Sequence, residues 1–125
     1  MNRQGYYSPQ RGYWEVVGRV TEKLLVQFPD DTIEVPLRPN TYSFWRDGVW
    51  VENENVKYHY FADIVRAERN EKLAKEVDPL VTNPLRWNDL TESQKTNISE
   101  YRRQLLDISN QPGFPYNVAW PTLNM

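Results

Sequence analysis

Hydrophobic and polar positions change their spacing near Phe61. Over residues 13–60, β-branched and aromatic residues alternate with polar ones, which is typical of strands that bury one face. Over residues 66–76, charged residues dominate and acidic side chains precede basic ones by four positions, which favours a helix. These patterns predict an α+β fold: a small antiparallel β unit over 13–60, then a two-helix hairpin and an extended aromatic and proline-rich tail within 61–125.

The clearest local signal in the first half is Asp47-Gly48, which separates two apolar runs. An Asp-Gly pair favours a two-residue hairpin turn, because both central positions need φ above zero. If these two residues form the whole loop, Trp45 and Trp50 face each other as a cross-strand aromatic pair. Further strand-like patterns cover residues 13–20, 24–28 and 32–35.

The second half predicts two antiparallel helices. The first covers about residues 61–77 and ends at Asp78-Pro79, because proline cannot continue a helix. The second begins after Thr91, an expected N-cap whose capping box is completed by Gln94. Apolar residues recur along it in a heptad-like seam: Ile98, Tyr101, Leu105 and Ile108.

Prolines at positions 112, 115 and 121 predict an extended tail after the second helix. Large side chains then occupy alternate positions and face one way along this tail: Phe114, Tyr116, Val118 and Trp120. Such a tail must bury its rings against another protein or against this chain's own helices, where Trp87 is the natural partner.

The first twelve residues are rich in Gly, Tyr, Pro, Gln and Arg. Two interpretations of residues 1–12 stay open. One is a flexible leader, since disorder concentrates at termini. The other is an extended arm whose Tyr6 and Tyr7 become ordered on a partner.

Trp, Tyr-Arg and Phe-Pro motifs follow one another in a distinctive order towards the C-terminus. The residues of this order that we expect to form a scaffold are Trp87, Tyr101, Arg102, Leu105, Phe114, Pro115, Trp120 and Pro121. The order resembles the C-terminal signature of tailed-phage tail fibre assembly proteins, a tail assembly chaperone-like family. The resemblance is dense over residues 85–121 and fainter over 61–80, and it leaves roughly the first half of the chain uncovered.

The resemblance implies a small protein that helps a phage tail fibre protein to fold or trimerise. Two forms of this role stay open: a transient chaperone in the host cytoplasm, or a retained virion component that joins the fibre to a baseplate protein. Long β-structured fibres fold slowly and expose unpaired edges, so a partner that covers them has an evident use.

Composition excludes other classes of function. Fifteen basic residues are interleaved with 17 acidic ones, and this balance, with no basic block, argues against nucleic-acid binding. No apolar run approaches the ~20 residues that a membrane span needs, and the polar start lacks a signal-peptide core. The chain has no cysteine, which removes disulfides and thiolate chemistry. We therefore expect cytoplasmic synthesis without secretion.

Catalysis, metal binding and cofactor binding are not expected. His59 is the only histidine, and no ligand spacing or Gly-x-Ser-x-Gly elbow accompanies it, so we interpret it as structural. Asp30 and Asp31 follow a proline and are interpreted as solvated turn residues. No Gly-rich phosphate loop is present.

Aromatic residues make up 14% of the chain, and we expect those outside the signature to form the partner-specific surface: Tyr6, Tyr7, Trp14, Trp45 and Trp50. The main hypothesis is therefore a non-catalytic assembly factor that binds a tail fibre subunit. The alternative is a carbohydrate-binding module at the fibre tip, in which these rings stack on sugars. A simpler interpretation is that half of the rings build the core of the β unit. The sequence leaves the oligomeric state open.

Overall fold

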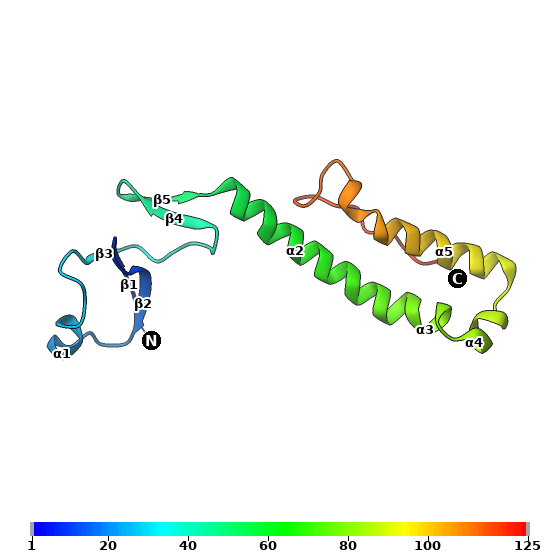
Figure 1. Cartoon of the computed structure of the whole chain (residues 1–125), viewed down its shortest axis with the longest axis horizontal. Helices are drawn as coiled ribbons and strands as arrows, with labels where there is room; N and C mark the ends of the chain where they lie inside the picture. Colours follow the sequence, from blue (N-terminus) through cyan, green and yellow to red (C-terminus); the bar gives the residue numbers. More distant parts are fainter. Residues whose placement is uncertain (1, 125) are drawn as a thin grey trace. The chain divides into compact units, whose positions relative to one another are not determined.

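The computed structural model describes residues 2–124 and has an α+β fold. The chain divides between Glu54 and Asn55 into two compact units. Unit 1 contains the strands, and unit 2 contains the long helices (Figure 1).

Unit 1 is built on a three-stranded antiparallel sheet with the strand order β2-β1-β3. The strands of this sheet are β1 (Arg3–Ser8), β2 (Gly12–Val17) and β3 (Ile33–Val35). The short helix α1 (Glu22–Leu25) lies between β2 and β3 in the chain. Residues 3–8 therefore differ from the expected flexible or partner-ordered arm, because both edges of this segment find main-chain partners in β2 and β3. Residues 24–28 also differ from the expected strand: Thr21 caps a helical turn there by accepting a hydrogen bond from the Leu24 N–H at 3.3 Å.

A second, two-stranded sheet pairs β4 (Ser43–Arg46) with β5 (Val49–Glu52). The predicted two-residue turn is confirmed, since Asp47 and Gly48 have φ of 52° and 82°. The predicted cross-strand pair is confirmed as well, because Trp45 lies directly opposite Trp50.

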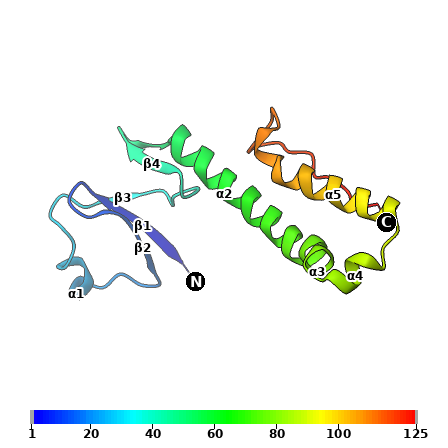
Figure 2. The same ribbon diagram turned by 45° about the vertical axis from the view of Figure 1, so that its right-hand side comes forward.

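Unit 2 begins with a nearly continuous helical run that turns back through a short helix into a second long one. Its elements are α2 (Glu54–Lys72), the π-helical segment η1 (Leu73–Val77), α3 (Asp78–Val81), α4 (Pro84–Asn88), α5 (Glu92–Leu106) and the 3₁₀ turn η2 (Ile108–Asn110). Figures 1 and 2 show α5 returning alongside α2. The predicted capping box at Thr91 and Gln94 is confirmed.

The first helical run is longer than predicted at both ends. It starts at Glu54 rather than near Phe61, where tyrosines alternating with polar residues had suggested strand. It also continues past Asp78-Pro79, because Pro79 occupies the first turn of α3, the part of a helix in which proline is best tolerated.

The π-helical segment η1 keeps the buried face of this run in phase. Val65 and Val77 are both buried, yet twelve residues of a regular helix correspond to about three and a third turns, at 3.6 residues per turn. A π segment accommodates one extra residue in a turn, and eleven residues make close to three turns. The segment therefore returns Val77 to the side that faces α5.

The core of unit 2 joins η1 to α5. Val77, Ile98, Tyr101 and Leu105 form a buried cluster. Half-buried hydrophobic residues surround this cluster: Leu73, Leu80, Trp87, Leu90, Trp120 and Leu123. Because the last two belong to the tail, the tail completes the helix core.

The tail is only partly extended. Residues 111–117 form turns, and the Asn117 N–H donates to the Gly113 carbonyl at 2.8 Å. Residues 118–124 then continue without regular structure. The expected alternation of rings on one extended segment therefore does not apply to Phe114 and Tyr116, which lie within the turns.

Candidate protein-interaction surfaces

Signature residues in unit 2 mostly face its interior. Tyr101 and Leu105 are buried in the helix core, and Pro115 is buried in the turn region of the tail. Arg102 differs, because it is exposed on α5. The half-buried signature residues are Trp87, Phe114, Trp120 and Pro121.

Gln111 fixes the path of the tail. Its side-chain amide donates to the Ala119 carbonyl at 2.8 Å and accepts from the Ala119 N–H at 2.8 Å, as a neighbouring strand would. Gly113 allows the turn between them to close, since a Cβ at this position would lie 2.1 Å from the Asn117 carbonyl oxygen. These polar contacts place Trp120 where it can pack on the core.

Cationic side chains lie over four aromatic rings of unit 2, which we call the capped rings. The pairs are Lys57 over Tyr116 at 5.7 Å, Arg66 over Phe114 at 5.5 Å, Lys72 over Trp120 at 5.5 Å and Lys95 over Trp87 at 5.9 Å. Cation–π attraction operates within about 6 Å of a ring centroid, and the aliphatic stems cover apolar surface at the same time.

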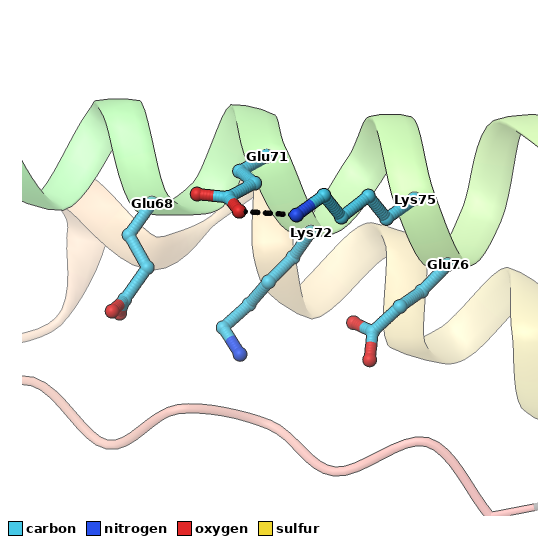
Figure 3. A pocket seen from close by; sticks show the side chains of 5 residues that line it. All are labelled: Glu68, Glu71, Lys72, Lys75 and Glu76. Carbon is cyan, nitrogen blue, oxygen red and sulfur yellow. Dashed lines mark hydrogen bonds and ion pairs between the residues drawn. The ribbon is translucent and has the colours of Figure 1, made fainter.

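A charged groove runs along the end of α2 and η1 (Figure 3). Its lining residues are Glu68, Glu71, Lys72, Lys75 and Glu76. The Lys75 ammonium donates to Glu71 at 2.6 Å, which lowers the pKa of the Glu71 carboxyl and raises that of Lys75. Both groups are thereby held in their charged forms at neutral pH, the opposite of what a general acid or base requires.

Tyr101 links the core to this groove. Its hydroxyl donates a hydrogen bond to the Glu76 carboxylate across the two helices. Burial, followed by this hydrogen bond, raises the pKa of Tyr101 to about 12. The contact therefore stabilises the helix pair while the tyrosine is protonated.

In unit 1, the five rings expected to contact a partner fall into two clusters on opposite faces of the main sheet. Tyr6, Trp14 and Phe28 pack together on one face, with centroids 5.0 to 5.9 Å apart. On the other face the rings form a chain from Tyr7 to Trp45 at 6.5 Å, Trp45 to Trp50 at 5.3 Å and Trp50 to Tyr13 at 4.9 Å. Tyr6 is buried, and the other four expected residues are half-buried.

Polar groups beside the second cluster are already hydrogen-bonded within the chain. The Trp50 indole N–H donates to the Pro36 carbonyl at 2.8 Å. Arg38 donates from its side chain to the carbonyls of Ser43 and Thr41, and its main-chain N–H donates to the Tyr13 hydroxyl. These bonds attach the hairpin to the sheet through the tryptophan face.

The opposite side of the hairpin, which we call the outward face, carries Phe44, Arg46, Val49 and Val51. Three of these side chains are unusually exposed for apolar residues: Phe44 at 45%, Val49 at 56% and Val51 at 40%. The aromatic pattern of the sequence does not single them out. Fixing the Asp47-Gly48 register would have identified them, because it places them on the face that lacks the tryptophans.

His59 and Asp31 each make contacts within their own unit. His59 is exposed on α2, with its ring edge-on to Tyr58 at 5.5 Å. Asp31 accepts a hydrogen bond from the buried Ser8 hydroxyl at 2.7 Å, so it supports the end of β1. Across residues 2–124, no group of three or more His, Asp or Glu side chains is placed to hold a metal ion. In the same residues, no helix has the length and apolar character needed to cross a membrane.

Comparison with known proteins adds one finding. Residues 62–123 match the family model described as phage tail assembly chaperone protein. The match spans α2 from its ninth residue, the whole of α5 and nearly all of the tail, and it leaves unit 1 outside. Searches of curated proteins and of solved structures returned no match.

Proposed function

Because residues 62–123 belong to the phage tail assembly chaperone family, we propose that this chain binds a protein of the phage tail and assists its assembly. The family match is the observation that carries this proposal. It agrees with the resemblance expected from the order of Trp, Tyr-Arg and Phe-Pro motifs.

The division into two units suggests that the two units have different roles. The signature residues of unit 2 are largely used in its own core and tail, which suits a common scaffold. Unit 1 lies outside the match and exposes apolar side chains. We therefore assign selection of the partner to unit 1.

A tail fibre subunit is the partner that we propose. Fibrous β-structures form many long-range contacts, fold slowly and expose unpaired strand edges, so they gain from a protein that covers those edges. The chain would act on the fibre in the host cytoplasm. It then either leaves the fibre or remains in the virion beside a baseplate protein.

The proposed role needs no catalysis. Assembly chaperone families are generally non-enzymatic, and the charged groove holds its Glu71 and Lys75 in their charged forms. The role of the chain is then to bind its partner, and the free energy of binding should come mainly from a few anchor residues.

Co-expression tests the proposal. Each tail protein of the same phage is co-expressed with the full chain and analysed by size-exclusion chromatography. We expect co-elution with the fibre protein and more fibre trimer when the chain is present. If no tail protein co-elutes and trimers form equally well without the chain, the proposal is wrong. Mass spectrometry of purified virions separates a retained component from a transient chaperone.

The carbohydrate-binding alternative has weaker support. Sugar sites combine a stacking ring with polar side chains that bond hydroxyl groups, and the polar groups beside Trp50 already bond to the chain itself. A change in tryptophan fluorescence on adding host-surface glycans would favour this alternative instead.

A further inference from the structure

The two faces of the β4–β5 hairpin are covered unequally. Trp45 and Trp50 pack on Tyr7 and Tyr13 of the main sheet. On the outward face the Arg38 guanidinium lies over the Phe44 ring at 5.1 Å, and Val49 and Val51 are exposed. A two-stranded hairpin is marginally stable unless it gains further strands or a cover on its apolar surface. Phe44, Val49 and Val51 therefore form an exposed apolar surface that a further strand could cover.

The outer edge of β5 offers main-chain hydrogen-bonding groups as well. In an antiparallel pair, hydrogen-bonded and non-hydrogen-bonded positions alternate, and Arg46 and Val49, which flank the two-residue turn, form a bonded pair. The Asn53 N–H donates to the Tyr42 carbonyl at 2.8 Å, in phase with this alternation. The N–H and C=O of Trp50 then point away from β4, to the side where the described chain supplies no further strand.

The other strand edges of unit 1 are less open. On β4, the Ser43 carbonyl accepts from the Arg38 side chain and the Ser43 N–H donates to the Asn40 carbonyl. On β2, Glu15 forms an ion pair with Arg3 at 3.3 Å, and charged residues at an edge oppose strand addition. β3 has only three residues. By contrast, β5 reads Val-Trp-Val-Glu, with strong strand-forming residues and no Gly or Pro.

We propose that β5 accepts an extended segment of a phage tail protein as a third strand. The added segment bonds to the outward main-chain groups of Trp50. Its apolar side chains, at alternate positions, pack beside Val49 and Val51 on the outward face. This inference rests on the proposed function and specifies its docking site: the partner is recognised as an unpaired apolar strand, which is the feature that an unassembled β-structured protein exposes.

Lysine substitutions on the outward face test this inference in the full chain. In the co-expression assay, Val49→Lys and Val51→Lys should each weaken binding of the tail protein about tenfold or more, equivalent to about 1.4 kcal/mol. Val17→Lys is the matched control, because Val17 on β2 is exposed to the same 56% as Val49. We expect the control to bind like the natural chain, and circular dichroism checks that each variant is folded.

Hydrogen exchange supplies a second measurement on the natural chain. The amide of Trp50 should exchange more slowly in the complex than in the free chain, because strand addition gives it an acceptor. Full-strength binding by both lysine variants, together with unchanged exchange over residues 49–52, overturns this docking site while leaving the assembly role intact. Failure of every tail protein to bind overturns both. Dimerisation of the free chain through β5 would assign the edge to a second copy and also overturn the inference.

Discussion

At the scale of single residues, Tyr101 makes a contact that depends on pH. It is 3% exposed and its pKa is raised from 10.0 to about 12 by burial and by its hydrogen bond to Glu76. A raised folded-state pKa means that the stabilisation is fully present below pH 10.0 and is lost as the pH rises towards about 12. We expect stability to fall by about 2 to 3 kcal/mol across this window, at about 1.4 kcal/mol per pKa unit.

Tyr101→Phe provides the comparison for this prediction. At neutral pH the variant should be less stable by about 1 kcal/mol, because it lacks the hydrogen bond. Between pH 10 and 12 the difference should vanish and then reverse, since phenylalanine does not ionise. Urea denaturation of both proteins at several pH values measures it. Parallel stability curves for the two proteins over this range would show that Tyr101 does not carry the effect.

At the scale of elements, the π-helical segment η1 predicts how the first helical run tolerates a deletion. Removing Ala74, which is exposed, should convert η1 to regular helix and leave Val65 and Val77 on the same side. The free energy of unfolding, measured by thermal denaturation, should then change by no more than about 1 kcal/mol. Removing Ser99 from α5, which is also exposed, should lower the stability much more, because it rotates Ile98 relative to Tyr101 within the core. Equal losses from both deletions would contradict this account of η1.

The sequence predicted elements wherever a local rule decides the outcome. Asp47-Gly48 fixed the hairpin register through its φ requirement, and Thr91 with Gln94 fixed the start of α5 through side-chain capping. Prediction from the sequence failed where contacts between residues far apart in the chain determine the secondary structure. Residues 3–8 carry few strand signals of their own and become the central strand because β2 and β3 flank them on both sides. The turns at 111–117 depend on the Gln111 contact with Ala119, which no local pattern indicates.

The sequence likewise predicts some of the candidate interaction residues and misses others. Aromatic content identified the rings of unit 1, but only the register shows that Trp45 and Trp50 face the main sheet. The outward face consists of ordinary strand residues, so composition cannot distinguish it. Which face of a hairpin is covered depends on contacts far along the chain.

At the scale of the whole molecule, the tail is expected to be a structural part of unit 2. Removing residues 112–125 takes away Trp120 and Leu123, which pack against the core cluster, and so uncovers part of that cluster. At about 25 cal/mol per Å² of apolar surface, the loss should be at least about 3 kcal/mol. Urea denaturation followed by circular dichroism measures it. Tyr116→Ala, at a position that is 52% exposed, serves as a mild control. An unchanged unfolding midpoint in the truncated chain would show that the tail is dispensable for folding.

The capped rings affect the solubility of the chain. Hydrophobic residues make up only 39% of the chain. Four aromatic rings of unit 2 nevertheless lie near its surface, and a charged side chain lies over each of them. Three lysines and one arginine of the surface thus shield apolar patches through which unfolded or crowded molecules would adhere to each other. Resistance to aggregation therefore depends on where the cations of this chain lie more than on their number.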